Sequence, residues 1–369
     1  MNDYKNKNFA FFKPPFGGGL EGAKLLTYMK QAIMINPGNI EFRDVEVPGE
    51  LAPNEILLKI QRIGVCGSDI HVFHGEHPAT PYPVVQGHEY SATIAAVGEA
   101  VKSAKVGQRA TARPQLVCGK CGPCLRGQYN ACQELKVQGF QAPGVAQEYF
   151  VVPEDRLVVF PDSMSFEHGA MIEPAAVGAH STSRSKGLEG KNVVVSGAGT
   201  IGNLVAQFAK ARGAKKVLIT DVSDFKLNKA LECGIEDTLN VLKTPFNEGI
   251  KATFGNEGYQ VGFEAAGVQA SLDALIANVE KGGEVIILGV YAKNPTVNMY
   301  FVGEHELNLY GSMMYRHEDY KEAAKLISEG KIILDPLVSK HFPFDQYLEA
   351  YNFIGESGDK VMKVMIDLT

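Results

Sequence analysis

Residues 192–213 read NVVVSGAGTIGNLVAQFAKARG, and this stretch decides half of the fold. Its first five residues are an apolar run typical of a buried strand, and from Ile201 apolar residues recur with the spacing of an amphipathic helix. Gly197, Gly199 and Gly202 form G-x-G-x-x-G between the two. These glycines permit a tight turn, close backbone approach to a pyrophosphate, and close helix–strand packing. The stretch therefore predicts a dinucleotide-binding turn.

Strand-like runs alternate with helical segments on the C-terminal side of this turn. Further strands are expected at 216–220, 238–241, 261–265, 284–290 and 306–311. Six strands in such an alternation predict a doubly wound parallel sheet of the α/β class. We expect this nucleotide-binding domain to span residues 179–312.

The residues around the turn indicate which cofactor binds. Thr200 and Ile201 open the helix, whose free N–H groups would face the phosphates. Asp221 closes the second strand 19 residues after Gly202, where a carboxylate can accept both ribose hydroxyls of NAD and would repel the 2′-phosphate of NADP. We therefore expect NAD, a helix N-cap being the alternative role for Asp221. Lys226 is expected over the adenine ribose, with a solvated helix lysine as its alternative.

Before residue 160 the sequence shows short β-branched runs separated by Gly and Pro, for example at 55–65, 90–98, 108–113, 147–153 and 157–160. This pattern predicts an all-β unit of barrel type. We expect a catalytic domain built from residues 29–178 and 313–369, because the C-terminal segment is interpreted as returning to the β unit. Residues 1–28 show neither helical nor strand periodicity, so they are expected to be an N-terminal extension.

Four of the six cysteines lie close together in a Gly- and Pro-rich lobe at about residues 114–134: Cys118, Cys121, Cys124 and Cys132. The spacing C-x2-C-x2-C-x7-C indicates four thiolate ligands around one structural zinc. Two disulfides or free thiols are the alternative. Nothing near the N-terminus resembles a secretion signal and cytosolic thiols stay reduced, so we expect a cytoplasmic zinc protein.

A second set of metal-binding residue types is spread along the chain. Cys66 follows a predicted strand, His88 and Glu89 begin another, and Glu173 lies just before the nucleotide domain. A thiolate, an imidazole and a carboxylate together suit a catalytic zinc with an open position. Each residue alone has an ordinary structural role, so the prediction depends on their joint occurrence. The sequence leaves open whether Glu89 or Glu173 completes the zinc shell.

Composition and charge exclude other classes of function. A chain of 369 residues fits two domains. The formal charge of −6 is spread without a Lys/Arg block, which argues against nucleic-acid binding. No apolar run approaches the roughly 18 residues needed to cross a bilayer, so no membrane span is expected. A small-molecule substrate is favoured.

Five motifs occur in the order seen in zinc-dependent medium-chain alcohol dehydrogenases: C-G-S-D-x-H from Cys66, G-H-E from Gly87, the four-cysteine lobe, E-P-A-A-V-G-A-H from Glu173, and G-A-G-T-I-G from Gly197. Residues 30–369 resemble this superfamily, and within it most closely the polyol and diol dehydrogenases. The resemblance implies a GroES-like β-barrel domain beside a Rossmann domain, and two zinc ions per subunit. It also implies hydride transfer from a secondary alcohol of a polyol to NAD, giving a ketose.

The same resemblance assigns roles to further residues. It implies that Ser68 and His71 relay the released proton, a surface histidine being the alternative for His71. Asp69 is expected to orient His88, and Lys363 to reach the cofactor pyrophosphate, with a solvated lysine as its alternative. A homo-oligomer, a dimer or a tetramer, is expected.

Substrate choice is the least determined feature. Val72 and Met314 stand where sorbitol dehydrogenases usually have Tyr and Arg, which indicates a more apolar pocket and a shorter diol or a differently held polyol. Arg316 and His317 are alternative sources of polarity. We rank polyols first, with 2,3-butanediol, threonine and sugar-alcohol phosphates as alternatives. A catalytically silent nucleotide-binding relative is disfavoured, because such a protein would be expected to have lost ligands.

Overall fold

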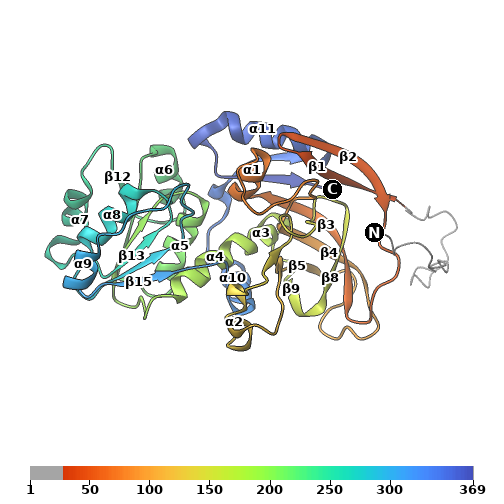
Figure 1. Ribbon diagram of the computed structural model, residues 1–369, viewed down its shortest axis with the longest axis horizontal. Helices are drawn as coiled ribbons and strands as arrows, with labels where there is room; N and C mark the ends of the chain where they lie inside the picture. Colours follow the sequence, from red (N-terminus) through yellow and green to blue (C-terminus); the bar gives the residue numbers. More distant parts are fainter. Residues whose placement is uncertain (1–27, 369) are drawn as a thin grey trace.

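The computed structural model describes residues 28–368 and is built around two large sheets (Figure 1). The predicted N-terminal extension therefore lies outside the described residues, except for Tyr28, which begins strand β1. Among residues 28–368, no helix has the length and apolar character that a membrane crossing requires.

The nucleotide-binding sheet has six parallel strands in the order β12-β11-β10-β13-β14-β15, which confirms the predicted doubly wound fold. Its strands are β10 (Asn192–Ser196), β11 (Lys216–Asp221), β12 (Asp237–Asn240), β13 (Val261–Glu264), β14 (Glu284–Ile287) and β15 (Asn308–Gly311). Its helices are α5 (Thr200–Ala211), α6 (Asp224–Glu232), α7 (Phe246–Phe254), α8 (Gln269–Asn278) and α9 (Met299–Glu304). Two separate apolar clusters pack against its residues, as expected for a sheet with both faces covered.

The second sheet has seven strands in the order β16-β17-β3-β4-β5-β9, with β8 also paired to β3. Its strands are β3 (Glu55–Val65), β4 (Glu89–Val97), β5 (Arg109–Ala112), β8 (Tyr149–Pro153), β9 (Leu157–Phe160), β16 (Val338–Pro343) and β17 (Lys363–Asp367). The C-terminal strand β17 pairs antiparallel with β3, so the end of the chain rejoins this sheet. The domain boundaries given above stay a prediction.

Shorter elements complete the chain. Two further two-stranded sheets are formed by a hairpin of β1 (Tyr28–Asn36) and β2 (Asn39–Glu46) and by a small pair of β6 (Gln115–Leu116) and β7 (Lys136–Val137). The remaining α-helices are α1 (Gly67–Phe73), α2 (Gly122–Leu125), α3 (Phe166–Ala170), α4 (Ile172–Ser183), α10 (His317–Ser328) and α11 (Tyr347–Ser357).

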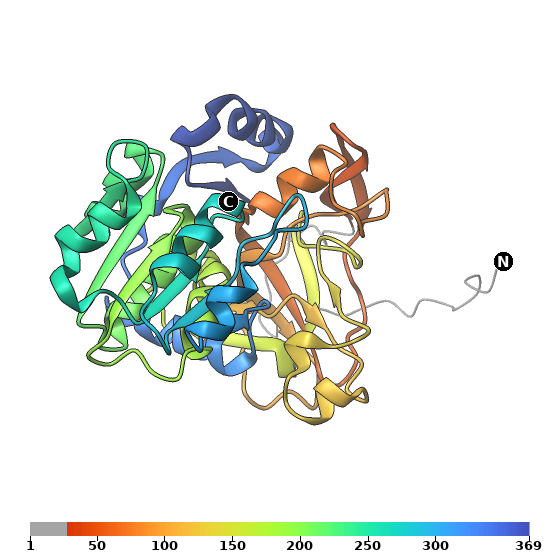
Figure 2. The ribbon, with the colours of Figure 1, turned by 60° about the vertical axis from the view of Figure 1, so that its left-hand side comes forward.

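Helices α4 and α10 lie at the junction between the two sheets (Figure 1). One apolar cluster joins residues of both units, among them Ala175 of α4, Phe208 of α5, Ala323 of α10 and Met365 of β17. Packing at this junction is close, because a Cβ added to Gly178 of α4 would lie 2.9 Å from the Phe208 ring. The four-cysteine lobe, which carries α2, lies beside α10 in both views (Figures 1 and 2).

Candidate active site and metal centres

The four cysteines of the lobe meet at one point. One sulfur atom from each of Cys118, Cys121, Cys124 and Cys132 lies within 4.8 Å of the others. The Cys121 and Cys132 sulfurs are 3.9 Å apart, far longer than a disulfide bond, and all four thiols are free. Backbone N–H groups of Gln133 and Cys124 lower the pKa of Cys121 to about 6, which favours the thiolate form, whereas burial and the neighbouring thiols raise the pKa of Cys124 to about 12. The cluster therefore fits a closed structural zinc site.

A second group forms where α1 and β4 begin. Cys66 is the N-cap of α1, while His88 and Glu89 stand at the start of β4. One ligand atom from each of these three residues lies within 4.8 Å of the others, and both His88 and Glu89 are buried. A half-buried thiol with a buried imidazole and carboxylate fits a catalytic zinc with three protein ligands and an open position. Among the described residues, Glu173 is not part of this group.

Asp69 lies behind His88, as the sequence predicted. Its Oδ1 atom is 3.4 Å from His88 Nδ1, and Oδ2 accepts the backbone N–H of Cys66 at 3.0 Å. Burial lowers the pKa of His88, whereas the charge and hydrogen bond of Asp69 raise it. The effect of Asp69 outweighs that of burial, so the pKa lies well above its ordinary value. Because a metal binds neutral imidazole through its free nitrogen, Asp69 is placed to fix which nitrogen of His88 faces the ligand group.

Lys363 is not the solvated lysine of the alternative interpretation, and its partners were not predicted. Its ammonium is buried and lies 2.6 Å from Glu89 Oε2, and it also donates to the Val65 carbonyl at 3.0 Å. A side chain held in this way contacts the metal-binding group and not the nucleotide turn. Gly64 leaves space for the pair, because a Cβ there would lie 2.4 Å from Glu89 Oε2.

Glu173 stands beside the Cys66–His88–Glu89 group, in the first turn of α4. Burial raises the pKa of its carboxyl to about 7, with the charge of His88 acting in the opposite direction. Tyr315 donates its hydroxyl hydrogen to Glu173 Oε1. Sequence reasoning missed Tyr315. No local sequence signal joins the two residues, which are 142 positions apart.

The glycine turn has the geometry that its motif requires. Gly197 has a φ of +103°, which favours glycine, and a Cβ at Gly202 would lie 1.8 Å from the Gly197 carbonyl oxygen. A Cβ at Gly199 would meet no protein atom within 4 Å, so the space beside it is open for a ligand. Thr200 and Ile201 form the first turn of α5 behind this loop.

Asp221 lies at the end of β11, against the same turn. Its Oδ2 atom accepts the N–H of Ala198 at 2.7 Å, and its Oδ1 atom accepts those of Val222 and Ser223. Asn203 was missed by sequence reasoning; its amide donates to the Ala198 carbonyl at 2.6 Å and so braces the loop from inside α5. Both side chains therefore shape the surface that a dinucleotide would contact.

Other predicted residues lie further out. Ser68 is half-buried in the first turn of α1, whereas His71 is exposed and lies 3.0 Å from Glu76. Lys226 is half-buried in the first turn of α6. Val72 is fully buried in the core of the β unit, so it does not line a pocket as the sequence comparison suggested.

A third group of metal-binding residue types, Glu167, His168 and Asp335, lies near the surface. His168 Nε2 is already 2.5 Å from Asp335 Oδ1, and the Asp335 side chain is 79% exposed. Because this group is more exposed than the Cys66–His88–Glu89 group, we assign it no role in catalysis.

Comparison with known proteins identifies both halves of the chain. Residues 52–162 match the alcohol dehydrogenase GroES-like domain, and residues 200–329 match the zinc-binding dehydrogenase domain. Sorbitol dehydrogenase of Bacillus subtilis is 31% identical over 92% of this chain and 97% of its own length. L-threonine 3-dehydrogenase of Proteus mirabilis is 32% identical over 90% of this chain and 96% of its own length.

The fold is shared with solved structures as well. A protein from Sinorhizobium meliloti, described as a zinc-binding dehydrogenase bound to NADP, matches with a TM-score of 0.86 and 30% identity. The match covers 92% of this chain and 99% of that one.

Proposed function

Because this chain belongs to the zinc-dependent medium-chain dehydrogenases, we propose that it oxidises a secondary alcohol of a polyol to a ketose with NAD. The observation that carries the proposal is the convergence of half-buried Cys66 and buried His88 and Glu89, whose ligand atoms lie within 4.8 Å of one another. Glu173 stands beside that point, and the glycine turn of the same chain is shaped for a dinucleotide. A silent relative would have no need to keep such a buried ligand group.

Different residues of the chain would bind the metal and the cofactor. Zinc, when bound, supplies a Lewis acid that lowers the pKa of an alcohol hydroxyl, and NAD supplies the hydride acceptor. Cys66, His88 and Glu89 would hold the metal, and Lys363 balances the charge of Glu89. Gly199 leaves room for the pyrophosphate, so the two reactants can be brought together.

Ser68 and His71 are the proposed route for the proton that leaves the alcohol. Ser68 is half-buried one turn before His71 on α1, and the His71 side chain is 61% exposed. An exposed imidazole can pass protons between a half-buried hydroxyl and solvent. The route therefore leads from the ligand group at Cys66 outward along one short helix.

The substrate class is the finer part of the proposal. Sorbitol dehydrogenase among the relatives supports a polyol, and the threonine relative makes threonine the first alternative. Diols and sugar-alcohol phosphates follow. Because Val72 is buried in the core, one of the two reasons for expecting a more apolar pocket no longer holds, which favours polyols further. NADP is the alternative cofactor, since the Sinorhizobium relative is bound to it.

A panel assay tests the proposal. Sorbitol, xylitol, 2,3-butanediol, threonine and a sugar-alcohol phosphate are each supplied with NAD or NADP, and reduced cofactor is followed by absorbance, with and without a chelator. Chelator-sensitive NAD reduction on a polyol is expected. Chelator-insensitive activity would rule out the catalytic zinc, and a preference for threonine would replace the polyol assignment.

Assembly is a separate prediction. Strand β15 ends the parallel sheet and exposes its backbone edge, with Leu309 and Tyr310 half-buried beside it. An unpaired edge of this kind can pair with a second copy, so we propose a homo-oligomer. Sedimentation of the purified protein as a monomer would contradict it.

A further inference from the structure

The segment from Met313 to His317 links the nucleotide sheet to α10 and contains a strained residue. Met314 has a φ of +47°, in the left-handed region that non-glycine residues rarely adopt. A residue in this conformation persists only where its surroundings hold it. Something outside the segment must therefore fix its backbone.

Side chains of the four-cysteine lobe hold this backbone at alternate residues. The Asn130 amide donates to the Met313 carbonyl at 2.9 Å. The Gln115 amide donates to the Tyr315 carbonyl at 2.7 Å, and Gln115 is almost completely buried. Both bonds flank Met314, so the strained residue is fixed from each side.

A third contact holds the end of the segment. The backbone N–H of His317 donates to the hydroxyl oxygen of Tyr129, which is also a lobe residue. The Arg113 guanidinium at the base of the lobe packs over the Tyr129 ring and donates to His317 Nδ1 at 3.2 Å. The carbonyls of residues 313 and 315 and the N–H of residue 317 are thus all bound by the lobe.

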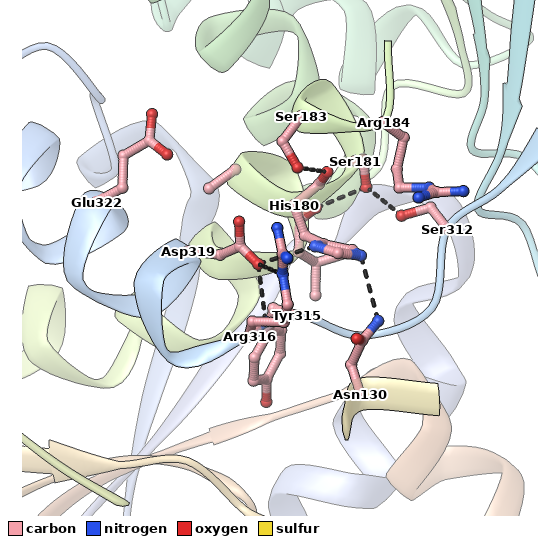
Figure 3. Close-up of polar contacts among 12 residues, drawn as sticks. Asn130, His180, Ser181, Ser183, Arg184, Ser312, Tyr315, Arg316, Asp319 and Glu322 are labelled. Atoms are coloured by element: carbon pink, nitrogen blue, oxygen red, sulfur yellow. Dashed lines mark hydrogen bonds and ion pairs between the residues drawn. The ribbon is translucent and has the colours of Figure 1, made fainter. Parts of the chain in front are cut away.

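The lobe also reaches α4, the helix that carries Glu173 (Figure 3). His180 lies between Asn130 and Asp319: its Nε2 atom is 3.3 Å from the Asn130 amide, and its Nδ1 atom is 2.8 Å from Asp319 Oδ2. The same Asp319 oxygen accepts the backbone N–H of Arg316 at 2.7 Å. Because the Asn130 amide nitrogen can only donate, the imidazole donates in turn to Asp319, and all three side chains are buried.

We propose that the four-cysteine lobe positions Tyr315, and that Tyr315 in turn positions the Glu173 carboxylate at the active site. Tyr315 has no exposed surface, and its hydroxyl donates to Glu173 Oε1. The lobe is thus a clamp on the 313–317 segment as well as a metal-stabilised loop. The proposal rests on the proposed function, in which Glu173 belongs to the catalytic centre; Tyr315 is a positioning residue.

Hydrogen exchange measured by mass spectrometry on the full-length, metal-loaded protein tests the clamp without any substrate. The variant Gln115→Met removes the donor to Tyr315 at nearly constant volume. The exchange rate at the amides of Arg316 and His317 is expected to rise about fivefold, because losing the net free energy of one hydrogen bond raises the population of the open state by about that factor. The control is Gln207→Met, which loses a bond to the Ile333 carbonyl at 3.0 Å and one from the Ile333 N–H at 2.6 Å, both outside the lobe, and should leave those two amides unchanged.

Met314→Gly provides a rescue, since glycine takes a positive φ without strain. Added to Gln115→Met, it should slow exchange at residues 316 and 317 again. Unchanged exchange in Gln115→Met, or faster exchange after adding Met314→Gly, would overturn the clamp.

A double-variant cycle tests the second step with kcat and KM measured separately. Gln115→Met and Tyr315→Phe should each lower kcat about fivefold with little change in KM, and the double variant should lose no more than either alone. Losses that multiply would overturn transmission through Tyr315. If no alcohol is oxidised at all, the proposed function fails, whereas the exchange experiment still decides the clamp.

Discussion

Replacing Gly202 by alanine should damage the nucleotide turn in a way that the structure makes quantitative. The new Cβ would lie 1.8 Å from the Gly197 carbonyl oxygen and 2.9 Å from its carbon, both of them backbone atoms that cannot rotate away. The oxygen contact must open to at least about 3 Å, which pushes α5 away from the turn. Overpacking of this kind costs about 1–3 kcal/mol. We expect that loss in urea unfolding.

Cofactor binding should weaken in the same variant, because the turn and the helix N-terminus bind the same phosphates. If the whole strain energy is lost from the free energy of binding, NADH affinity should fall by up to about a hundredfold. Fluorescence titration measures this affinity. Stability within about 0.5 kcal/mol of the unmodified protein, together with unchanged NADH affinity, would refute the reasoning.

Gly199→Ala is the matched control. No protein atom lies within 4 Å of a Cβ at this position, and Gly199 has a φ of −64°, which alanine accepts. Stability should fall by less than about 1 kcal/mol, the cost of alanine at a helix N-cap. NADH affinity should nevertheless fall tenfold or more, because the methyl group occupies the space for the pyrophosphate. A stability loss without an affinity loss would contradict the role given to this glycine.

Three further predictions concern charged groups. Lys363→Met leaves Glu89 buried without its partner and should lower the free energy of unfolding by about 3–5 kcal/mol, with recovery when Glu89→Gln is added; a loss below about 1 kcal/mol would contradict the pairing. Asp221→Asn removes the charge that we propose faces the ribose, so it should lower the ratio of NADP to NAD dissociation constants at least tenfold, whereas an unchanged ratio would show that Asp221 does not select NAD. Burial, helped by the charge of Arg113, lowers the pKa of His317 from 6.5 to about 4. The unfolded chain therefore binds a proton between these values that the folded chain does not, so stability should fall as the pH drops through this window, and less steeply in His317→Gln. Equal pH slopes for the two proteins would contradict it.

The features that sequence predicted best are those whose chemistry is local. The turn at Gly197 and the cluster beginning at Cys118 are each encoded within about 15 residues, because a tight turn and a zinc loop both need fixed short spacings. The parallel sheet also followed from the alternation of strands and helices. Such patterns can be recognised before any tertiary structure is known.

The contacts that sequence could not predict join distant residues. Lys363 meets Glu89 across 274 positions, and sequence could not predict this pair because burial beside a carboxylate is decided by the return of β17 to β3. Val72 was placed in the pocket because it stands where sorbitol dehydrogenases usually have Tyr. Successive residues of a helix point to different sides, however, so His71 is exposed and Val72 is buried. Partners of this kind depend on the packed fold.

Metal analysis of the purified protein and of Cys66→Ser tests the catalytic metal centre most directly, after surface-bound metal has been removed by a brief chelator wash. The two buried or half-buried ligand groups predict about two zinc ions per chain in the unmodified protein. Cys66→Ser should keep one zinc and its fold but lose alcohol oxidation. Two zinc ions and full activity in Cys66→Ser would contradict the assignment.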